Sequence, residues 1–252
     1  MNKIPQITLL FWVMKISATT LGETAGDLLS MTMDVGYAVS SLILFSIFLA
    51  TLVGQLLSKK YHPWLYWTVI LSTSTAGTTM SDYMDRTLGL GYAKGSMILV
   101  GILASIFAYW RATEKSLSVV EIRTFKVEML YWMAILFSNT LGTALGDYLA
   151  DDSGLGFAGG AALIGGLLVL VVAIARFTNI SRVLLFWIAF VLTRPFGATL
   201  GDVLTKTHDN GGLGFGTIGS SAVLAVILAA AVFYKTILIQ RQPVPHLVRA
   251  NE

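Results

Sequence analysis

The stretch that decides the fold is WMAILFSNTLGTALGD, residues 132–147, because its pattern occurs four times in the chain. In each copy a Trp lies fifteen residues before an Asp, a Gly lies five residues before that Asp, and a small residue lies directly before it. The Trp/Asp pairs are Trp12/Asp27, Trp67/Asp82, Trp132/Asp147 and Trp187/Asp202. One unit has therefore been copied four times, at Asp-to-Asp intervals of 55, 65 and 55 residues.

The composition places this repeat in a membrane. The 252 residues are 55% hydrophobic and only 12% charged, whereas charged residues make up about a quarter of a soluble domain. A helical span needs about 20 mostly apolar residues. The sequence predicts an all-α membrane protein with eight transmembrane helices. The predicted spans are 8–29, 37–57, 64–84, 92–111, 129–149, 156–176, 183–204 and 214–238.

Each repeat supplies two of these spans, so consecutive repeats enter the membrane in the same orientation. Repeats of this kind are related by an axis along the membrane normal. We expect a single transmembrane domain, 1–252, with pseudo-fourfold (2+2) symmetry and a charged cytoplasmic loop at about 112–128. The predicted repeats are 8–57, 64–111, 129–176 and 183–238.

The distribution of Lys and Arg predicts the orientation. Twelve of them fall in the termini and loops on one side, and two, Arg86 and Lys206, on the other. By the positive-inside rule both termini are cytoplasmic, and the expected location is a bacterial inner membrane. We expect the repeated Trp residues to anchor at the inner interface, and Lys15 to extend its ammonium group toward the same surface. The basic residues are explained by topology, so no nucleic-acid partner is expected.

A polar stripe runs along three of the four odd-numbered helices, because positions four apart share a helix face. In lipid, polar groups must face protein or water, so these helices are expected to surround a common axis with the even helices outside. The alternative is that the repeated Asp residues are exposed loop-entry residues. Steps of four and eight before each Asp give Thr19, Glu23 and Asp27; Ser74, Thr78 and Asp82; Asn139, Thr143 and Asp147; and Arg194, Ala198 and Asp202.

Glu23 and Arg194 have no counterparts in the other repeats and lie on matching faces. Isolated charges in a bilayer are costly, which predicts that they pair. The pair is either a structural salt bridge or a coupling pair that opens during transport. Pro195 is expected to break or kink its helix and free carbonyl groups at that depth.

Glycines beside the stripe form small-x3-small motifs, which let helices pack closely. The predicted packing glycines are Gly22, Gly26, Gly77, Gly142, Gly146, Gly197 and Gly201, with Ser81 as the small residue in repeat two.

The chain resembles a family of bacterial membrane proteins built from four tandem repeats, each with two transmembrane segments and a shared Trp. The resemblance covers about residues 8–238 and rests on the Trp-x14-Asp and Gly-x3-small-Asp patterns. The repeat is one of unknown function, so the resemblance implies the architecture and no activity. Repeat four departs most, with Arg194-Pro195 and a three-residue insertion before Gly214.

No catalytic residue is predicted, because the three His lie in loops or the tail and no nucleophile has a His base nearby. We expect no enzyme and no bound cofactor. The oxygen-rich stripe suits a hard cation such as H⁺, Na⁺, Mg²⁺ or Mn²⁺, with the four repeated Asp as metal ligands. The leading prediction is a cation transporter. A cation channel with a four-Asp outer ring and a non-transporting membrane scaffold remain open, as does a homo-oligomer.

Overall fold

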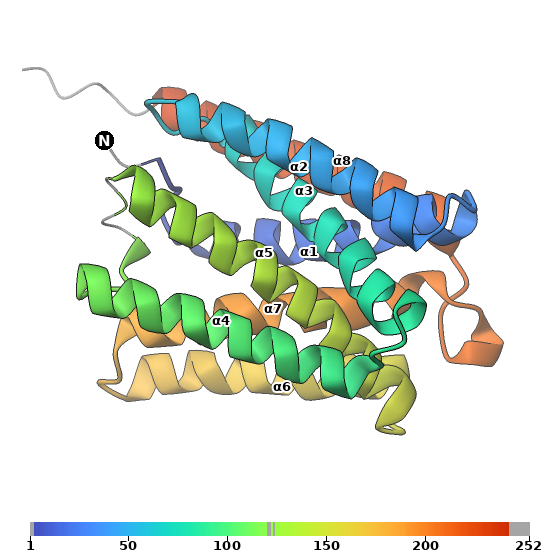
Figure 1. Cartoon of the computed structure of the whole chain (residues 1–252). Helices are drawn as coiled ribbons and strands as arrows, with labels where there is room; N and C mark the ends of the chain where they lie inside the picture. Colours follow the sequence, from blue (N-terminus) through green and yellow to red (C-terminus); the bar gives the residue numbers. More distant parts are fainter. Residues whose placement is uncertain (1–2, 120–121, 123, 242–252) are drawn as a thin grey trace, which may run out of the picture.

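The computed structural model describes residues 3–119, 122 and 124–241. Among these residues eight long α-helices form a bundle and no strand occurs (Figure 1). Arg123 and Arg249, two bases used to orient the chain, lie outside the described residues. The helices are α1 (Leu9–Asp27), α2 (Tyr37–Leu57), α3 (Pro63–Asp82), α4 (Tyr92–Glu114), α5 (Phe125–Asp147), α6 (Gly156–Phe177), α7 (Arg182–Thr205) and α8 (Gly216–Arg241).

Local sequence explains where the helices begin. The side chains of Thr8, Thr124 and Ser181 accept hydrogen bonds from the third backbone N–H of α1, α5 and α7, as N-cap residues do. The even helices use glycine instead. Gly36 and Gly91 precede α2 and α4 with φ of 80° and 72°, a left-handed conformation that other residues rarely adopt. All four repeats have a glycine with positive φ followed by an aromatic residue here: Gly36-Tyr37, Gly91-Tyr92, Gly156-Phe157 and Gly214-Phe215.

The repeated Asp marks the end of three odd helices. A single π-helical turn follows each of them: η1 (Leu28–Thr32), η2 (Tyr83–Thr87) and η4 (Tyr148–Asp152). Helix α7 instead continues past Asp202 to Thr205, and a 3₁₀ turn, η5 (His208–Asn210), follows. The insertion in repeat four therefore coincides with a different exit from the helix. Helix α7 also runs unbroken through Pro195, so the expected break does not occur.

Helices α1, α3, α5 and α7, the inner helices, form a closed ring of contacts in which each packs against two others. The outer helices lie around them (Figure 1): α2 packs on α3, α4 on α5, α6 on α7, and α8 on α1. Each outer helix thus packs mainly on the inner helix of the following repeat, and α8 closes the circle. We call the two ends of the bundle the Trp end and the Asp end, after the repeated residues at each end of the inner helices.

The outer surface is apolar. Leu42, Val169 and Val226 on α2, α6 and α8 are 68–69% exposed. Apolar surface that extends over whole helices is unusual for a protein surrounded by water. Five helices, α2, α4, α6, α7 and α8, are long and apolar enough to cross a membrane. Helices α1, α3 and α5 fall short by composition because they carry the polar stripe, which the bundle buries.

The glycines of the stripe lie where inner helices touch. A Cβ on Gly22 would overlap Ser74 of α3, and one on Gly142 would overlap the Arg194 side chain of α7. A Cβ on Gly197 would likewise overlap Thr19 of α1. The glycines therefore admit the neighbouring helix's polar side chain at close range, which is what small residues do between membrane helices.

Candidate functional site

The four repeated Asp residues form the Asp layer. All four are buried, with no more than 4% of the surface of any residue exposed, so they are not the exposed loop-entry residues of the alternative interpretation. Two basic side chains bridge them in pairs. Arg86 contacts Asp82 (Nε–Oδ1 3.0 Å) and Asp147 (Nη2–Oδ2 3.4 Å). Lys206 contacts Asp27 (Nζ–Oδ2 3.1 Å) and Asp202 (Nζ–Oδ1 3.2 Å).

Both bridging bases were missed as site residues, since the sequence interpretation assigned them to the outer loops. A signal was available. Each lies four residues after a repeated Asp, on the same helical face, so extending the stripe one further step would have included it. Burial alone would lower the pKa of Lys206, but Asp202 and Asp27 raise it overall, so the ammonium group stays charged.

About two turns deeper on α7, eight residues before Asp202, Arg194 joins all four inner helices. From α7 its Nη1 donates to Glu23 Oε2 (2.9 Å) and to the Thr19 carbonyl (3.3 Å) of α1. Its Nη2 donates to Thr78 Oγ1 of α3 (2.5 Å) and Thr143 Oγ1 of α5 (2.7 Å). The side chain is fully buried. The charged guanidinium group therefore lies on the bundle axis and fills it.

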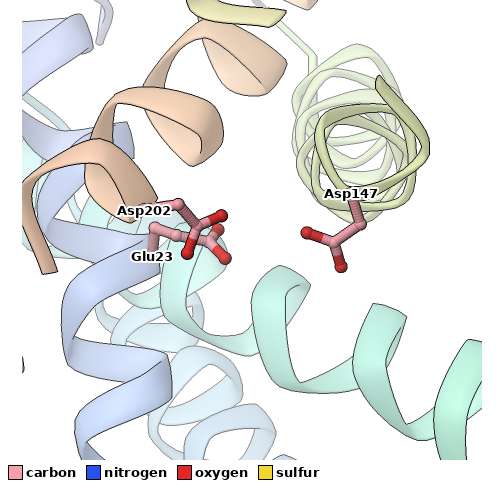
Figure 2. A group of neighbouring side chains, drawn as sticks. All are labelled: Glu23, Asp147 and Asp202. Atoms are coloured by element: carbon pink, nitrogen blue, oxygen red, sulfur yellow. The ribbon is translucent and has the colours of Figure 1, made fainter. Parts of the chain in front are cut away.

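Glu23 lies between this hub and the Asp layer. One carboxylate oxygen each of Glu23, Asp147 and Asp202 falls within 4.8 Å of the others, and Figure 2 shows Asp147 approaching the other two from the opposite side. This group of three, rather than the four repeated Asp, is what the structure brings within reach of one ion. Four Asp and Glu23 meet Arg86, Lys206 and Arg194, so two negative charges are in excess if all are ionised.

Below Arg194 the axis holds Lys15, and here the sequence-based expectation is wrong. Lys15 does not reach the surface but is 0% exposed. Its Nζ donates to Asn139 Oδ1 at 3.4 Å and lies 4.2 Å from the centre of the Phe190 ring. Asn139 in turn donates to Thr73 Oγ1 at 2.9 Å. Among the described residues no carboxylate forms a salt bridge with Lys15. The side-chain oxygen of Asn139 is therefore the polar partner that positions the Lys15 amine.

At the Trp end aromatic side chains close the bundle. The hydroxyls of Tyr66 and Tyr131 lie 2.6 Å apart. Trp67, Trp132 and Trp187 are 1–4% exposed, so these three pack inside the bundle and are not surface anchors as expected. They make edge-on contacts with the neighbouring rings, an arrangement that stabilises aromatic clusters.

At the Asp end a polar cavity of about 440 Å³ opens beside the Asp layer. Its lining includes Arg86, Asp202 and Lys206, together with Asp151 and Asn210. We call it the Asp-end vestibule. It brings solvent to the two bridging bases and to one carboxylate of the group of three.

Asp85 is a buried acid that the sequence analysis did not single out. It accepts a hydrogen bond from Ser81 Oγ (3.3 Å), and its carboxylate occupies the space that a Cβ on Gly95 would need. Burial raises the pKa of Asp85 to about 6. No other repeat has an acid three residues after its Asp, which is the signal that could have singled it out.

The repeat pattern of the sequence matches that of a known family. A protein-family model described as Repeat of Unknown Function (DUF347) matches residues 10–61, 65–116, 130–181 and 185–238. The chain belongs to this repeat family. Its four matches each contain one Trp/Asp pair, as the sequence resemblance implied. No curated protein and no solved structure matches the chain.

Proposed function

We propose that this DUF347-family chain is a multi-pass carrier for a small hard cation such as H⁺, Na⁺, Mg²⁺ or Mn²⁺. The observation that carries the proposal is the buried group of Glu23, Asp147 and Asp202, which belongs to a set of five acids that share only three basic partners. Buried carboxylates that outnumber their basic partners need protons or a bound cation for compensation. Carboxylate and hydroxyl oxygens are the ligands that hard cations prefer.

The proposed setting is a bacterial inner membrane with eight spans, both termini cytoplasmic and the Asp end outside. The positive-inside rule and the exposed apolar outer helices support it. In this setting the four repeats have pseudo-fourfold (2+2) symmetry about the membrane normal. The pairing of acids supports the 2+2 grouping, because Arg86 serves repeats two and three and Lys206 serves repeats four and one.

The path starts at the Asp-end vestibule, which faces outside in this proposed setting. An arriving cation competes with Lys206 for Asp202 and with Arg86 for Asp147, and the displaced bases turn toward the vestibule that they line. The cation is then held by the group of three, with Thr78 and Thr143 beside Glu23. Arg194 faces the same Glu23 oxygen, so the occupied site weakens the Glu23–Arg194 contact. This is how binding would be coupled to rearrangement of α7 against α1.

A carrier accounts for the axis better than a channel does. An open pore needs a continuous water path, whereas Arg194, Lys15 and the Tyr66–Tyr131 pair fill successive levels of this axis. Passage therefore requires the inner helices to move, as in alternating access.

The test is ion flux into proteoliposomes, with H⁺, Na⁺, K⁺, Mg²⁺ and Mn²⁺ screened separately. The double variant Asp147→Asn/Asp202→Asn is expected to lose flux of the transported ion. The matched control, Asp152→Asn/Asp209→Asn, removes two exposed acids from the same end and is expected to keep it. Absence of flux for every ion in the unmodified protein, with the double variant only less stable, would make the acid group structural and favour a membrane scaffold.

A further inference from the structure

A cavity of about 690 Å³ lies at the Trp end, far from the acid group, in the groove between α4 and α7. Its walls are apolar. Phe107 of α4 and Leu184, Ile188 and Val191 of α7 line it, and Leu184 and Ile188 are 53% and 38% exposed. A groove of this shape on the outer surface of a membrane bundle accommodates a hydrocarbon chain.

The segment that follows α4 closes the groove at the Trp end. Trp187 donates its Nε1 hydrogen to the Leu117 carbonyl at 3.0 Å, and the Phe107 and Trp187 rings pack edge-on with centroids 4.8 Å apart. These contacts hold the segment over α7. The cavity is therefore bounded at the Trp end by a fixed backbone rather than open along its whole length.

The mouth at that end is basic and hydroxylated. Arg111 and Lys115 line it, together with Ser116 and Ser181. Neither base forms a salt bridge with any described residue, whereas the nearby Lys126 pairs with Glu114 and Lys3 pairs with Glu128. The lining includes no acidic side chain within the described part of the chain. Two unneutralised positive charges thus face the mouth.

The N-terminus of a helix adds to the positive charge at the mouth of the groove. Ser181 is the N-cap of α7, a 24-residue helix, and Ser181, Val183 and Leu184 at the start of this helix line the cavity. Free N–H groups and the helix dipole favour an anion at such a position. The mouth therefore suits a phosphate group, and the walls directly above it suit an acyl chain.

We propose that the α4–α7 groove binds an anionic phospholipid, with its phosphate between Arg111 and Lys115 and one acyl chain along Leu184 and Ile188. The proposal needs the chain to lie in a bilayer but does not depend on which ion is transported. The bases belong to the cytoplasmic side by the positive-inside rule, where the headgroups of that leaflet lie.

The other grooves show why this one is singled out. The repeated Trp12 lines a cavity of about 430 Å³ between α1, α6 and α7, whose basic residue, Arg182, already donates to the Ala175 carbonyl. Trp67 lines one of about 130 Å³ beside α8, with no basic residue in its lining. Of these three cavities, the one in the α4–α7 groove has the largest volume and is lined by two bases that form no salt bridge with a described residue.

The experiment is native mass spectrometry of the purified full chain in detergent, with added phosphatidylglycerol or phosphatidylcholine of identical acyl chains. We expect phosphatidylglycerol to bind at least about tenfold more tightly, given the attraction of two basic residues to an anionic headgroup. Arg111→Gln/Lys115→Gln should abolish this preference. The control Lys59→Gln/Lys60→Gln removes two exposed bases from the same end that line none of these cavities, and should preserve it.

Two further arms distinguish a lipid site from a site for free phosphate. Leu184→Trp/Ile188→Trp fills the apolar part of the groove and leaves the basic mouth unchanged. It should therefore weaken the binding of long-chain phosphatidylglycerol and leave the binding of glycerol phosphate unchanged. Equal binding of the two lipids, or equal loss in the Lys59/Lys60 control, would overturn the proposal. So would displacement of the lipid by millimolar inorganic phosphate, since the site would then be one for free phosphate. Each of these outcomes leaves the cation-flux result unaffected.

Discussion

Arg194 of α7 donates from Nη1 to Oε2 of Glu23 on α1 over 2.9 Å, and neither side chain is more than 4% exposed. The two residues are 171 positions apart in the chain and join repeat four to repeat one. This contact adds a buried charge pair to the close packing of α1 against α7 that completes the ring of inner helices. It also ties the group of three acids to the helix that carries Pro195.

The pair predicts non-additive stability. Glu23→Gln leaves a buried guanidinium without its carboxylate and should cost about 3–5 kcal/mol, as expected when one partner of a buried pair is removed. Glu23→Gln combined with Arg194→Gln removes both charges and should cost less than the single change. Thermal unfolding of the purified protein in detergent measures both.

A surface pair provides the control. Lys126 and Glu114 lie 3.3 Å apart with side chains 47% and 31% exposed. Lys126→Gln should cost no more than about 1 kcal/mol, because exposed ion pairs contribute little. Equal losses for Glu23→Gln and the double variant would show that the two charges are not energetically coupled.

The Asp layer predicts loss of transport without unfolding. Asp27→Asn removes one of the two acids that Lys206 bridges, and Asp147→Asn removes one that Arg86 bridges. In each case the base keeps its second Asp partner, so the bundle should stay folded. Flux should fall to background in both variants, measured in proteoliposomes beside their melting temperatures. Undiminished flux in both would contradict the carrier proposal.

The eight helices were predictable because each predicted span coincides with a helix of the structure to within about four residues. Span length and apolar content decide this, and both are local properties of the sequence. The contact between Glu23 and Arg194 was predictable as well, since two unmatched opposite charges on equivalent faces have few other partners in a membrane. The packing of each outer helix on the next repeat was not predictable, because it depends on which apolar surfaces meet.

The positions of the buried basic side chains were the part of the site that the sequence analysis predicted wrongly, and this has a physical reason. A Lys near a helix end satisfies its charge equally well by reaching the surface or by finding an internal acceptor. Lys15 stays inside the bundle because Asn139 and Phe190 lie across the axis from it. Arg86 and Lys206 likewise turn inward because the Asp layer is close. Loop position in a sequence does not distinguish these outcomes.

Lys15 is expected to be dispensable for folding. Its removal leaves no carboxylate unpaired among the described residues; Asn139 Oδ1 loses its donor, and Asn139 Nδ2 keeps its hydrogen bond to Thr73. Lys15→Met replaces a buried amine with an apolar side chain of similar length. The free energy of unfolding should therefore not fall, and any rise should be about 1 kcal/mol. Lys94→Met, at an exposed position, is the control for the change of residue type. A lower melting temperature for Lys15→Met alone would show that the amine stabilises the axis.

The close approach of the inner helices predicts which glycines cannot change. Gly142→Ala places a methyl group against the Arg194 side chain and should cost about 1–3 kcal/mol, the usual effect of overpacking. Gly101→Ala on α4 meets nothing within 4 Å and should be neutral or stabilising by up to about 1 kcal/mol, since Ala favours helix over Gly. Equal melting temperatures for the two variants would argue that α5 and α7 can separate at this point.

Asp85 predicts how stability depends on pH. Its folded pKa of about 6 lies above the value of about 3.9 expected in the unfolded chain, so the folded protein binds the proton more tightly. The stabilisation is fully present below about pH 4 and is lost as the pH rises through 6. Asp85→Asn, which stays uncharged beside Gly95, should therefore melt at a higher temperature than the unmodified protein at pH 7.5 and at a more similar temperature at pH 5. A difference that is the same at both pH values would show that the Asp85 carboxyl does not titrate in this range.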